Sequence, residues 1–360
     1  MLRDLTPSSS FMQKVVAKLL APFQSWETVI ASSAGVITSL TELSSKTAWL
    51  YLVSSFVIAW LIYRYARRRG LVDGHGSFTR FVFPADVYRQ RSAIIDYKFV
   101  AVDLSIKALV YSPFMAGVSW LIYKTVHPMF ANVILFDVSS TTLLTRSIVL
   151  TVMAFLMADF GFFFAHYLMH KSRVLWHFHE VHHSAEVLTP VTVYRVHPVE
   201  EIVNGCIAAV MGAVGAATYA AVAGTDVGII TLFGTNVIMF GFFLFAFQLR
   251  HSHVWLSYGP LLSRIFISPA QHQIHHSLDA RHWDKNYGFV LAIWDLIFRS
   301  LYVPATREVL TFGTGSDPRD FSSVSKMYFL PFVKAAREVG RWVPRHGPDR
   351  GTPQRTAATD

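Results

Sequence analysis

The distribution of histidines is the feature that most constrains how this chain can fold. Thirteen of its sixteen histidines lie between His166 and His282. Eight of them form three clusters: His166 and His170; His179, His182 and His183; His272, His275 and His276. Residues three or four apart share one face of a helix, so each cluster is expected to present its imidazoles to one point. The fold must then bring the three clusters together.

These clusters predict a metal site. Imidazole binds iron, zinc, copper and nickel, and zinc usually takes only four ligands. Eight converging imidazoles therefore fit two metal ions better than one. A single histidine is more often a surface or capping residue, but three clusters at helical spacing in one chain favour metal binding over that interpretation.

The composition predicts an integral membrane protein. Apolar residues make up 52% of the chain and charged residues 15%, and the mean hydropathy is +0.38, which is too apolar for an ordinary soluble domain. The net charge of +9 is attributed to lysines and arginines that face anionic lipid, and not to binding of nucleic acid. The single cysteine, Cys206, excludes an intrachain disulfide and a cysteine-based metal site.

Five apolar stretches are long enough to be predicted as membrane spans. The arginine-rich run 64–69 after the first stretch predicts that its end is cytoplasmic, and successive crossings then place all three clusters on the cytoplasmic side. The expected fold is an all-α integral membrane protein with about five transmembrane helices and a cytoplasmic, histidine-rich helical cap. The predicted spans are residues 47–63, 99–123, 147–165, 202–225 and 227–249.

Four regions are expected along the chain. Residues 1–46 form an N-terminal interfacial segment, and residues 47–146 contain the first transmembrane helices and their loops. Residues 147–303 form the histidine-box domain. Residues 304–360 form a peripheral helix followed by a disordered, polar C-terminal tail.

The clusters, with their neighbours, resemble the histidine boxes of a known family. The motifs His166-Tyr-Leu-Met-His170, His179-Glu-Val-His182-His183 and His272-Gln-Ile-His275-His276 are similar to the three boxes of the fatty acid hydroxylase and sterol desaturase superfamily of membrane di-iron oxygenases. The flanking sequences also match: Asp159, the RVHPVE stretch at 195–200, the DKNYG stretch at 284–288, and Trp294-Asp295. The resemblance covers residues 147–302, a little under half of the chain.

The resemblance implies a membrane enzyme in which histidines hold two iron ions and O2 is a co-substrate. Such an enzyme hydroxylates or desaturates a C–H bond of a lipid, either a fatty acyl chain or a sterol-like molecule. Two electrons per turnover would come from a separate carrier of ferredoxin or cytochrome b5 type with its reductase, because the sequence shows no dinucleotide-binding loop and no haem module. The box spacings resemble the sterol desaturase branch, and hydroxylation is favoured. A bacterial inner membrane is favoured over the endoplasmic reticulum.

Several residues outside the boxes are candidates for the same site. His251 and His197 are possible additional ligands, because two irons with open oxygen positions can use more than eight. Asp159 precedes His166 by about two turns on the same helical face, so it is predicted to orient a ligating histidine or to join two helices by a hydrogen bond. Supporting roles are also predicted for Arg195 and Asn286. No catalytic side chain is predicted beyond the metal ligands.

Two other functions remain open. The second cluster also fits the His-Glu-x-x-His signature of zinc peptidases, with Glu180 as general base between His179 and His183, although this leaves His182 and two clusters unexplained. The second alternative is a non-enzymatic metal-binding membrane protein, either a transporter or a haem-binding electron carrier. Transporter sites usually lie near the bilayer midplane, whereas these clusters lie beyond the predicted helix ends. The bound metal distinguishes these functions.

Overall fold

The computed structural model describes residue 27 and the ranges 49–70, 76–130, 140–223, 227–245, 247–315, 317 and 319–342. Within them the chain is helical apart from irregular connections and a two-stranded antiparallel hairpin, β1 (Thr231–Leu232) and β2 (Thr235–Asn236). The predicted interfacial segment 1–46, apart from residue 27, and the predicted tail after residue 342 lie outside the described residues.

Three helices are long and apolar enough to cross a membrane: α3 (Trp49–Arg68), α8 (Leu143–Lys171) and α10 (Pro198–Ala223). They coincide with the first, third and fourth predicted spans, and the chain is an integral membrane protein. Helix α8 has 29 residues and is about 44 Å long, which exceeds a hydrocarbon core of about 30 Å. Its C-terminal end, with His166 and His170, can therefore extend beyond the apolar layer.

The fifth predicted span, residues 227–249, is wrong. This segment folds into the β1–β2 hairpin and the eight-residue helix α11 (Val237–Leu244), followed by a short 3₁₀ turn. Phe233 and Gly234 turn the hairpin with φ angles of 50° and 78°, and the Asn236 side chain caps α11 by accepting a backbone hydrogen bond. Because α11 is only about 12 Å long, it cannot cross a bilayer alone.

The second predicted span, residues 99–123, is also not one of the three long apolar helices. Lys107, in the middle of this part of the chain, pairs with Asp103 at 2.6 Å and with Glu201 of α10 at 2.5 Å. These charges lower the hydropathy of the stretch and attach it to α10. The stretch is divided among α6 (Arg91–Ile106), the π-helical turn η2 (Lys107–Tyr111) and α7 (Ser112–Phe130).

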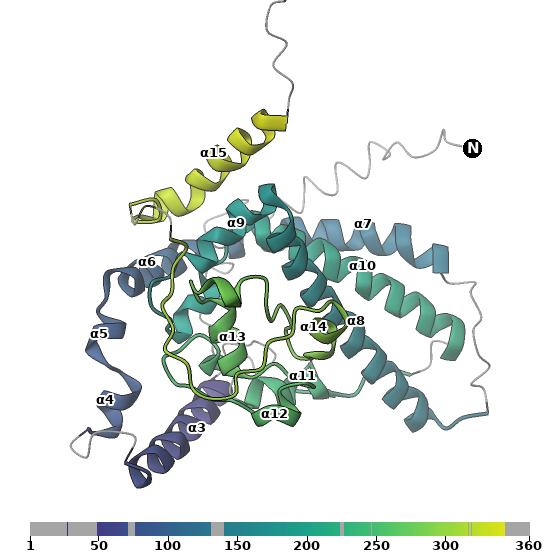
Figure 1. The fold of residues 1–360 in the computed structure, drawn as a ribbon. Helices are drawn as coiled ribbons and strands as arrows, with labels where there is room; N and C mark the ends of the chain where they lie inside the picture. Colours follow the sequence, from purple (N-terminus) through teal and green to yellow (C-terminus); the bar gives the residue numbers. More distant parts are fainter. Residues whose placement is uncertain are drawn as a thin grey trace, which may run out of the picture.

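Helix α9 (Arg173–His183) follows α8 after a single residue. Ser172 ends α8, and its hydroxyl accepts a hydrogen bond from the backbone N–H of Leu175 in the first turn of α9. The chain changes direction at this residue, so that α9 packs against α8 (Figure 1). The first two histidine clusters are thereby brought next to each other.

The third cluster lies on a short, well-capped helix, α13 (Pro269–His275). Ser268 and Gln271 form a capping box in which each side chain bonds to the backbone of the other, and Pro269 occupies the first helical position. Every residue of α13 is buried. The helix is therefore fixed in the interior, beside α9.

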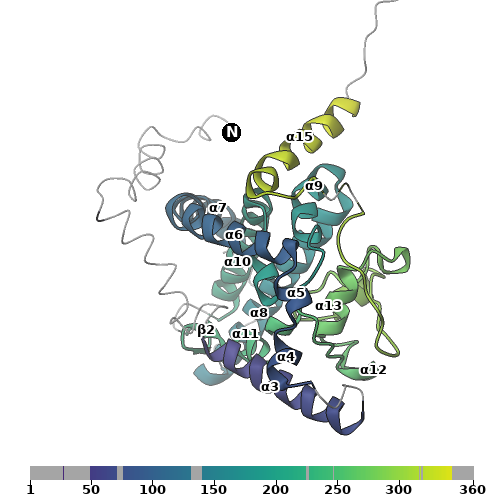
Figure 2. The ribbon, with the colours of Figure 1, turned by 90° about the vertical axis from the view of Figure 1, so that its left-hand side faces the viewer.

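Helix α15 (Val324–Trp342) lies on the outer side of α9, at the opposite end of the molecule from α3 (Figures 1 and 2). Its Met327 packs with Phe99 of α6 and Val181 of α9 in one buried apolar cluster. The helix lies within the region 304–360, where a peripheral helix was predicted. The remaining short elements are α4 (Phe78–Val82), α5 (Ala85–Tyr88), η3 (Pro190–Tyr194), α12 (Gly259–Leu262), η5 (Ala280–His282) and α14 (Ile293–Ile297).

Candidate metal centre

Nine histidines gather into two groups whose ring nitrogens converge. The five-histidine group consists of His166, His170, His179, His183 and His275. The four-histidine group consists of His182, His251, His272 and His276. Within each group the facing nitrogens lie within 4.8 Å of one another. The structure thus brings together all eight box histidines and adds His251.

The Nε2 atoms of the four-histidine group are spaced like ligands of one ion. His251 Nε2 lies 3.0 Å from that of His272, 3.2 Å from that of His182 and 3.2 Å from that of His276. Nitrogens bound about 2.1 Å from a shared metal are about 3.0 to 3.4 Å apart. Neither group includes a carboxylate or thiolate, and an all-imidazole donor set suits iron, zinc or copper.

Some ring nitrogens of the five-histidine group have no hydrogen-bond partner. His179 Nε2 lies 3.1 Å from the Nε2 atoms of His166 and His183. The Nε2 atoms of His170 and His275 are buried and have no hydrogen-bond partner. Buried polar atoms without a partner are rare and need an explanation. A metal ion among these converging lone pairs would supply the missing partner.

The second and third boxes are divided between the two groups. His179 and His183 belong to the five-histidine group, whereas His182 belongs to the four-histidine group. In the third box His275 joins the five-histidine group, and His272 and His276 join the other. Residues i and i+4 share a face more closely than i+3. The expectation that each box points at a single position is therefore wrong for the second and third boxes, because each of these supplies a pair of histidines to one group and a single histidine to the other.

Four of the nine histidines place Nδ1 next to an oxygen. A proton on Nδ1 that is donated to an oxygen leaves the Nε2 lone pair free for a metal, and it fixes the orientation of the ring. Three of them bond carbonyl oxygens: Tyr287 for His166 (2.9 Å), Lys285 for His275 (2.7 Å) and Arg195 for His182 (3.2 Å). His179 Nδ1 lies 2.9 Å from the Glu200 carboxylate, at ion-pair distance.

Burial keeps the histidines of the two groups in their neutral form. Loss of hydration, together with nearby positive charge and neighbouring histidines, holds the pKa of His182, His183, His272 and His276 well below the ordinary value. Burial also lowers the pKa of His275 to about 3. Neutral imidazole is the form that binds metal, so these rings are ready to ligate at neutral pH.

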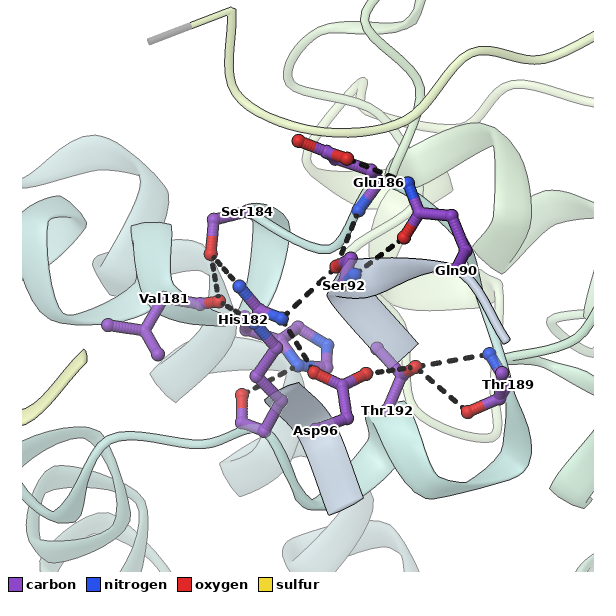
Figure 3. Close-up of polar contacts among 10 residues, drawn as sticks. Gln90, Ser92, Asp96, Val181, His182, Ser184, Glu186, Thr189 and Thr192 are labelled. Carbon is purple, nitrogen blue, oxygen red and sulfur yellow. Dashed lines mark hydrogen bonds and ion pairs between the residues drawn. The ribbon is translucent and has the colours of Figure 1, made fainter. Parts of the chain in front are cut away.

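Arg195, for which a supporting role was predicted, contacts the end of the helix that carries the second box. It is almost fully buried, and its guanidinium bonds Asp96 Oδ1 at 2.6 Å and Ser184 Oγ at 2.6 Å, and also the Val181 carbonyl. Figure 3 shows these contacts around Asp96, Val181 and Ser184, where α6 meets the end of α9. Since the Arg195 carbonyl faces His182, this network links the ion pair to the four-histidine group.

Asp159 forms no hydrogen bond with a histidine. Its carboxylate accepts hydrogen bonds from the N–H groups of Val290 and Leu291 and from Trp294 Nε1. It therefore joins α8 to the segment after the third box, which corresponds to the second of its two predicted roles, a bond between separate elements.

Asn286 has a related role in the loop that follows α13. Its side-chain nitrogen donates to the Gln271 carbonyl, and its side-chain oxygen accepts from the Tyr302 N–H. Its φ of 59° is in the left-handed region, which asparagine tolerates better than most residues. Asn286 thus ties the third-box helix to the segment that ends at Tyr302.

His197 is not part of either group. Its Nε2 donates to the Tyr328 carbonyl of α15 at 3.0 Å, and its Nδ1 accepts from the Val199 N–H. Both ring nitrogens are therefore occupied. This histidine attaches α15 to the segment after the second box, and the structure does not bring it to the candidate metal positions.

Three buried residues in this region were missed from the sequence. Glu200, which faces His179, lies in the first turn of α10, where an acidic residue is common for reasons of helix electrostatics alone. Arg250 Nη2 lies 3.0 Å from His272 Nδ1 and donates to the Gly288 carbonyl, but a cation after an apolar run is typical of a membrane flank. The third, Asp96, had no distinguishing sequence signal.

A pocket of about 480 Å³ opens onto the five-histidine group. Its wall includes His170, His183 and His275 of this group, together with Trp176 and Glu338. The four-histidine group contributes only His276 to this wall and is buried throughout. The five-histidine group is therefore the more accessible of the two.

Comparison with known proteins agrees with this centre. Residues 151–300 match the fatty acid hydroxylase family. The chain is 28% identical over 153 residues to an ornithine lipid hydroxylase from Rhizobium tropici, a match that covers 42% of each chain. It is 31% identical over 148 residues to the alkylglycerol monooxygenase of Homo sapiens, covering 40% of this chain and 29% of the relative. The alkylglycerol monooxygenase of Danio rerio is 27% identical over 158 residues, covering 44% and 31%.

The aligned region spans less than half the length of each of these relatives. No solved structure shows significant similarity to the chain. The match nevertheless includes all three boxes, both histidine groups and the segments that support them. The histidine-rich part of this chain, residues 151–300, matches the fatty acid hydroxylase family and is similar in sequence to lipid hydroxylases and monooxygenases.

Proposed function

We propose that the chain is a membrane non-haem di-iron oxygenase that hydroxylates a C–H bond of a lipid. The reaction is R–H + O2 + 2 e⁻ + 2 H⁺ → R–OH + H2O, in which one oxygen atom enters the substrate and the other leaves as water. The observation that carries the proposal is the convergence of nine buried or half-buried imidazoles into two adjacent groups. Two irons bound there would supply the activation of O2 by electron transfer.

The histidines have distinct parts in this proposal. The five-histidine group would hold one iron and the four-histidine group the other. Arg195, the Tyr287 and Lys285 carbonyls and Glu200 hold the rings in orientation through Nδ1. Because the pocket reaches the five-histidine group, the reacting C–H bond is placed on that side. The more deeply buried group is shielded from water by the surrounding protein.

The names of the relatives favour hydroxylation of a lipid over desaturation. One of them is an ornithine lipid hydroxylase, and others are alkylglycerol monooxygenases. Each name describes a polar lipid with a long apolar part. We therefore propose a bilayer lipid of this general kind as the substrate. A separate one-electron carrier of ferredoxin or cytochrome b5 type, with its reductase, supplies the two electrons, and the histidine groups face the cytoplasm at a bacterial inner membrane.

Iron content and product formation test the proposal. The protein is purified in detergent from cells grown on iron-57, and its metals and Mössbauer spectrum are measured. We expect about two irons per chain with coupled signals that change on reduction. Lipid extracts of cells with the wild-type chain should contain a species heavier by one oxygen than a lipid of cells with His275→Ala. Zinc without iron, or identical lipid profiles, would contradict the proposal.

The zinc peptidase alternative is less well supported by the geometry. Both carboxylate oxygens of Glu180 lie 3.0 Å from Lys334 Nζ of α15, so the supposed general base forms an ion pair with another helix. His179 and His183 share their position with three more histidines, whereas a catalytic zinc site usually has three protein ligands.

A further inference from the structure

Helix α15 has an inner and an outer face of different character. On the inner face, Met327 is buried in the cluster with α6 and α9. On the outer face, Phe329 and Phe332 are 70% and 50% exposed, and Val333 is also exposed. Exposed phenylalanines at this spacing are unusual on a surface that faces only water, and they indicate an interaction site.

Positive charge borders this apolar face. Lys326, Arg337 and Arg341 are exposed, and the side chain of Arg173, on the adjacent α9, is 79% exposed. The only acidic residue of α15, Glu338, is buried and pairs with Arg173 and Arg341. The outer face of α15 therefore presents aromatic rings and basic groups, a combination enriched in protein interfaces.

Helix α15 also contributes to the pocket at the candidate metal centre. Glu338, from the inner face of α15, lines the same pocket as His170 and His183. Trp176 of α9 also lines this pocket, and its ring centroid lies 5.1 Å from that of His170 and 5.4 Å from that of His183. A partner bound to α15 would therefore be separated from the five-histidine group by little more than α9.

The position of α15 favours a soluble partner over the bilayer. The helix packs on α9 and α6, and α9 begins where the long apolar helix α8 ends. In both views α15 lies on the outer side of α9, at the opposite end of the molecule from α3 (Figures 1 and 2). Its outer face is thus directed away from the candidate membrane helices, although its composition resembles that of an interfacial helix.

We propose that the outer face of α15, together with Arg173, is the docking surface for an acidic one-electron carrier protein. This inference rests on the proposed function, which requires electrons from outside the chain. Each bound carrier gives up one electron and is oxidised by one unit, and two successive encounters supply the two electrons of one turnover. The basic groups attract the acidic carrier, and the phenylalanines provide the apolar centre of a short-lived contact.

Binding of purified carriers tests the surface without any use of enzyme activity. The full-length, iron-loaded protein is placed in nanodiscs of uncharged lipid, and the dissociation constants of an acidic [2Fe–2S] ferredoxin and a soluble cytochrome b5 domain are measured at low and high salt. The test variant is Lys326→Glu/Arg337→Glu. The matched control is Arg80→Glu/Arg89→Glu, which makes the same charge change at exposed arginines near α4 and α5.

We expect at least one carrier to bind the wild-type protein more weakly at high salt. The α15 variant should raise the dissociation constant about tenfold at low salt and make it less dependent on salt. The control variant should change the dissociation constant less than about twofold. Phe329→Ser/Phe332→Ser should weaken binding at both salt concentrations. Iron content is measured for every variant, so a failure of the di-iron proposal is seen separately from a failure of docking.

Two results would overturn the docking proposal. One is equal loss of carrier affinity in the α15 variant and the control, which would mean that only net charge matters. The other is co-flotation with phosphatidylglycerol vesicles that depends on Lys326 and Arg337, without any α15-dependent binding of either carrier. That result would assign the helix to a membrane surface.

Discussion

The Nε2 atoms of His251 and His272 lie 3.0 Å apart, although the two residues come from different segments and only His272 belongs to a box. The same Nε2 atom of His251 also lies 3.2 Å from the Nε2 atoms of His182 and His276. His251 lies two residues after the 3₁₀ turn η4 (Phe247–Leu249), which ends the irregular segment where a fifth span was predicted. The four-histidine group is therefore completed by a residue from outside the three motifs.

Replacement of His251 by alanine should empty one of the two positions. We expect iron to fall from about two to about one per chain, because the four-histidine group loses its central nitrogen while the five-histidine group is unchanged. His253→Ala is the control, since its Nε2 is directed to the Phe81 carbonyl. Metal analysis of both variants checks the prediction. Full iron content in His251→Ala would contradict its role as a ligand.

Gly288→Ala should destabilise the folded protein at the loop that follows α13. A Cβ atom there would lie 2.7 Å from the Leu291 carbonyl oxygen, 2.7 Å from Ile267 and 2.8 Å from Asp295. Real Cβ atoms do not approach backbone this closely, so the loop must shift, at a cost of about 1 to 3 kcal/mol. The melting temperature in detergent measures the effect. Gly340→Ala on α15, where no atom is within 4 Å of the added carbon, should not lower it, because alanine is the better helix former.

The buried ion pair between Arg195 and Asp96 should tolerate little change. Arg195→Ala leaves Asp96 buried without its charge partner, and breaking such a pair costs about 3 to 5 kcal/mol. Arg195→Lys should restore only part of the lost stability, because one ammonium group cannot reproduce the hydrogen bonds to Asp96, Ser184 and Val181 together. Thermal denaturation should give the order wild type, Lys, Ala. Equal stability of the three proteins would contradict the network in Figure 3.

His197 should make the attachment of α15 sensitive to pH. Burial lowers the pKa of His197, whereas the unfolded value is about 6.5. The unfolded chain therefore takes up a proton before the folded chain does. The stability contributed by neutral His197 is present above about pH 6.5 and is lost as the pH falls below it, by at most about 1.4 kcal/mol per pH unit. Melting temperatures should fall less with decreasing pH in His197→Asn, and parallel curves would contradict the assignment.

The substitution Glu180→Gln distinguishes the proposed oxygenase function from the peptidase alternative. The substitution removes the charge that pairs with Lys334, and it should lower stability modestly while product formation continues. A peptidase would lose its general base and with it essentially all activity. Lipid hydroxylation by the variant, normalised to its iron content, is the measurement. Loss of turnover at full iron content would favour a direct chemical role for Glu180.

Much of the candidate centre could be predicted because histidine pairs at i and i+4 depend only on helical geometry. The distribution of ligands between the groups could not, since it depends on how α9 and α13 cross in space. His251 was predicted only as a possible ligand because a lone histidine carries no spacing signal. Asp159 was predicted from its spacing to share a face with His166, but its partners include backbone N–H groups of a distant segment, which no local pattern reveals.

The membrane part shows where hydropathy succeeds and where it fails. Helices α3, α8 and α10 were predictable because long apolar runs without internal turn signals form helices. In residues 227–249, Gly234 and Asn236 supply a turn and a helix cap, and these local signals outweigh overall apolarity. The capping box of Ser268 and Gln271, in contrast, is visible in the sequence and would have fixed the start of α13.

The division of the second and third boxes between the two histidine groups interlocks the two candidate metal positions. Inserting one residue between His179 and His182 would rotate one ring by about 100° relative to the other, and both metal positions would lose a ligand together. Neither position can be built, lost or altered alone by a change in the length of α9 or α13. The two candidate metal positions therefore change together, and their spacing is encoded in the three-residue step within a single turn of helix.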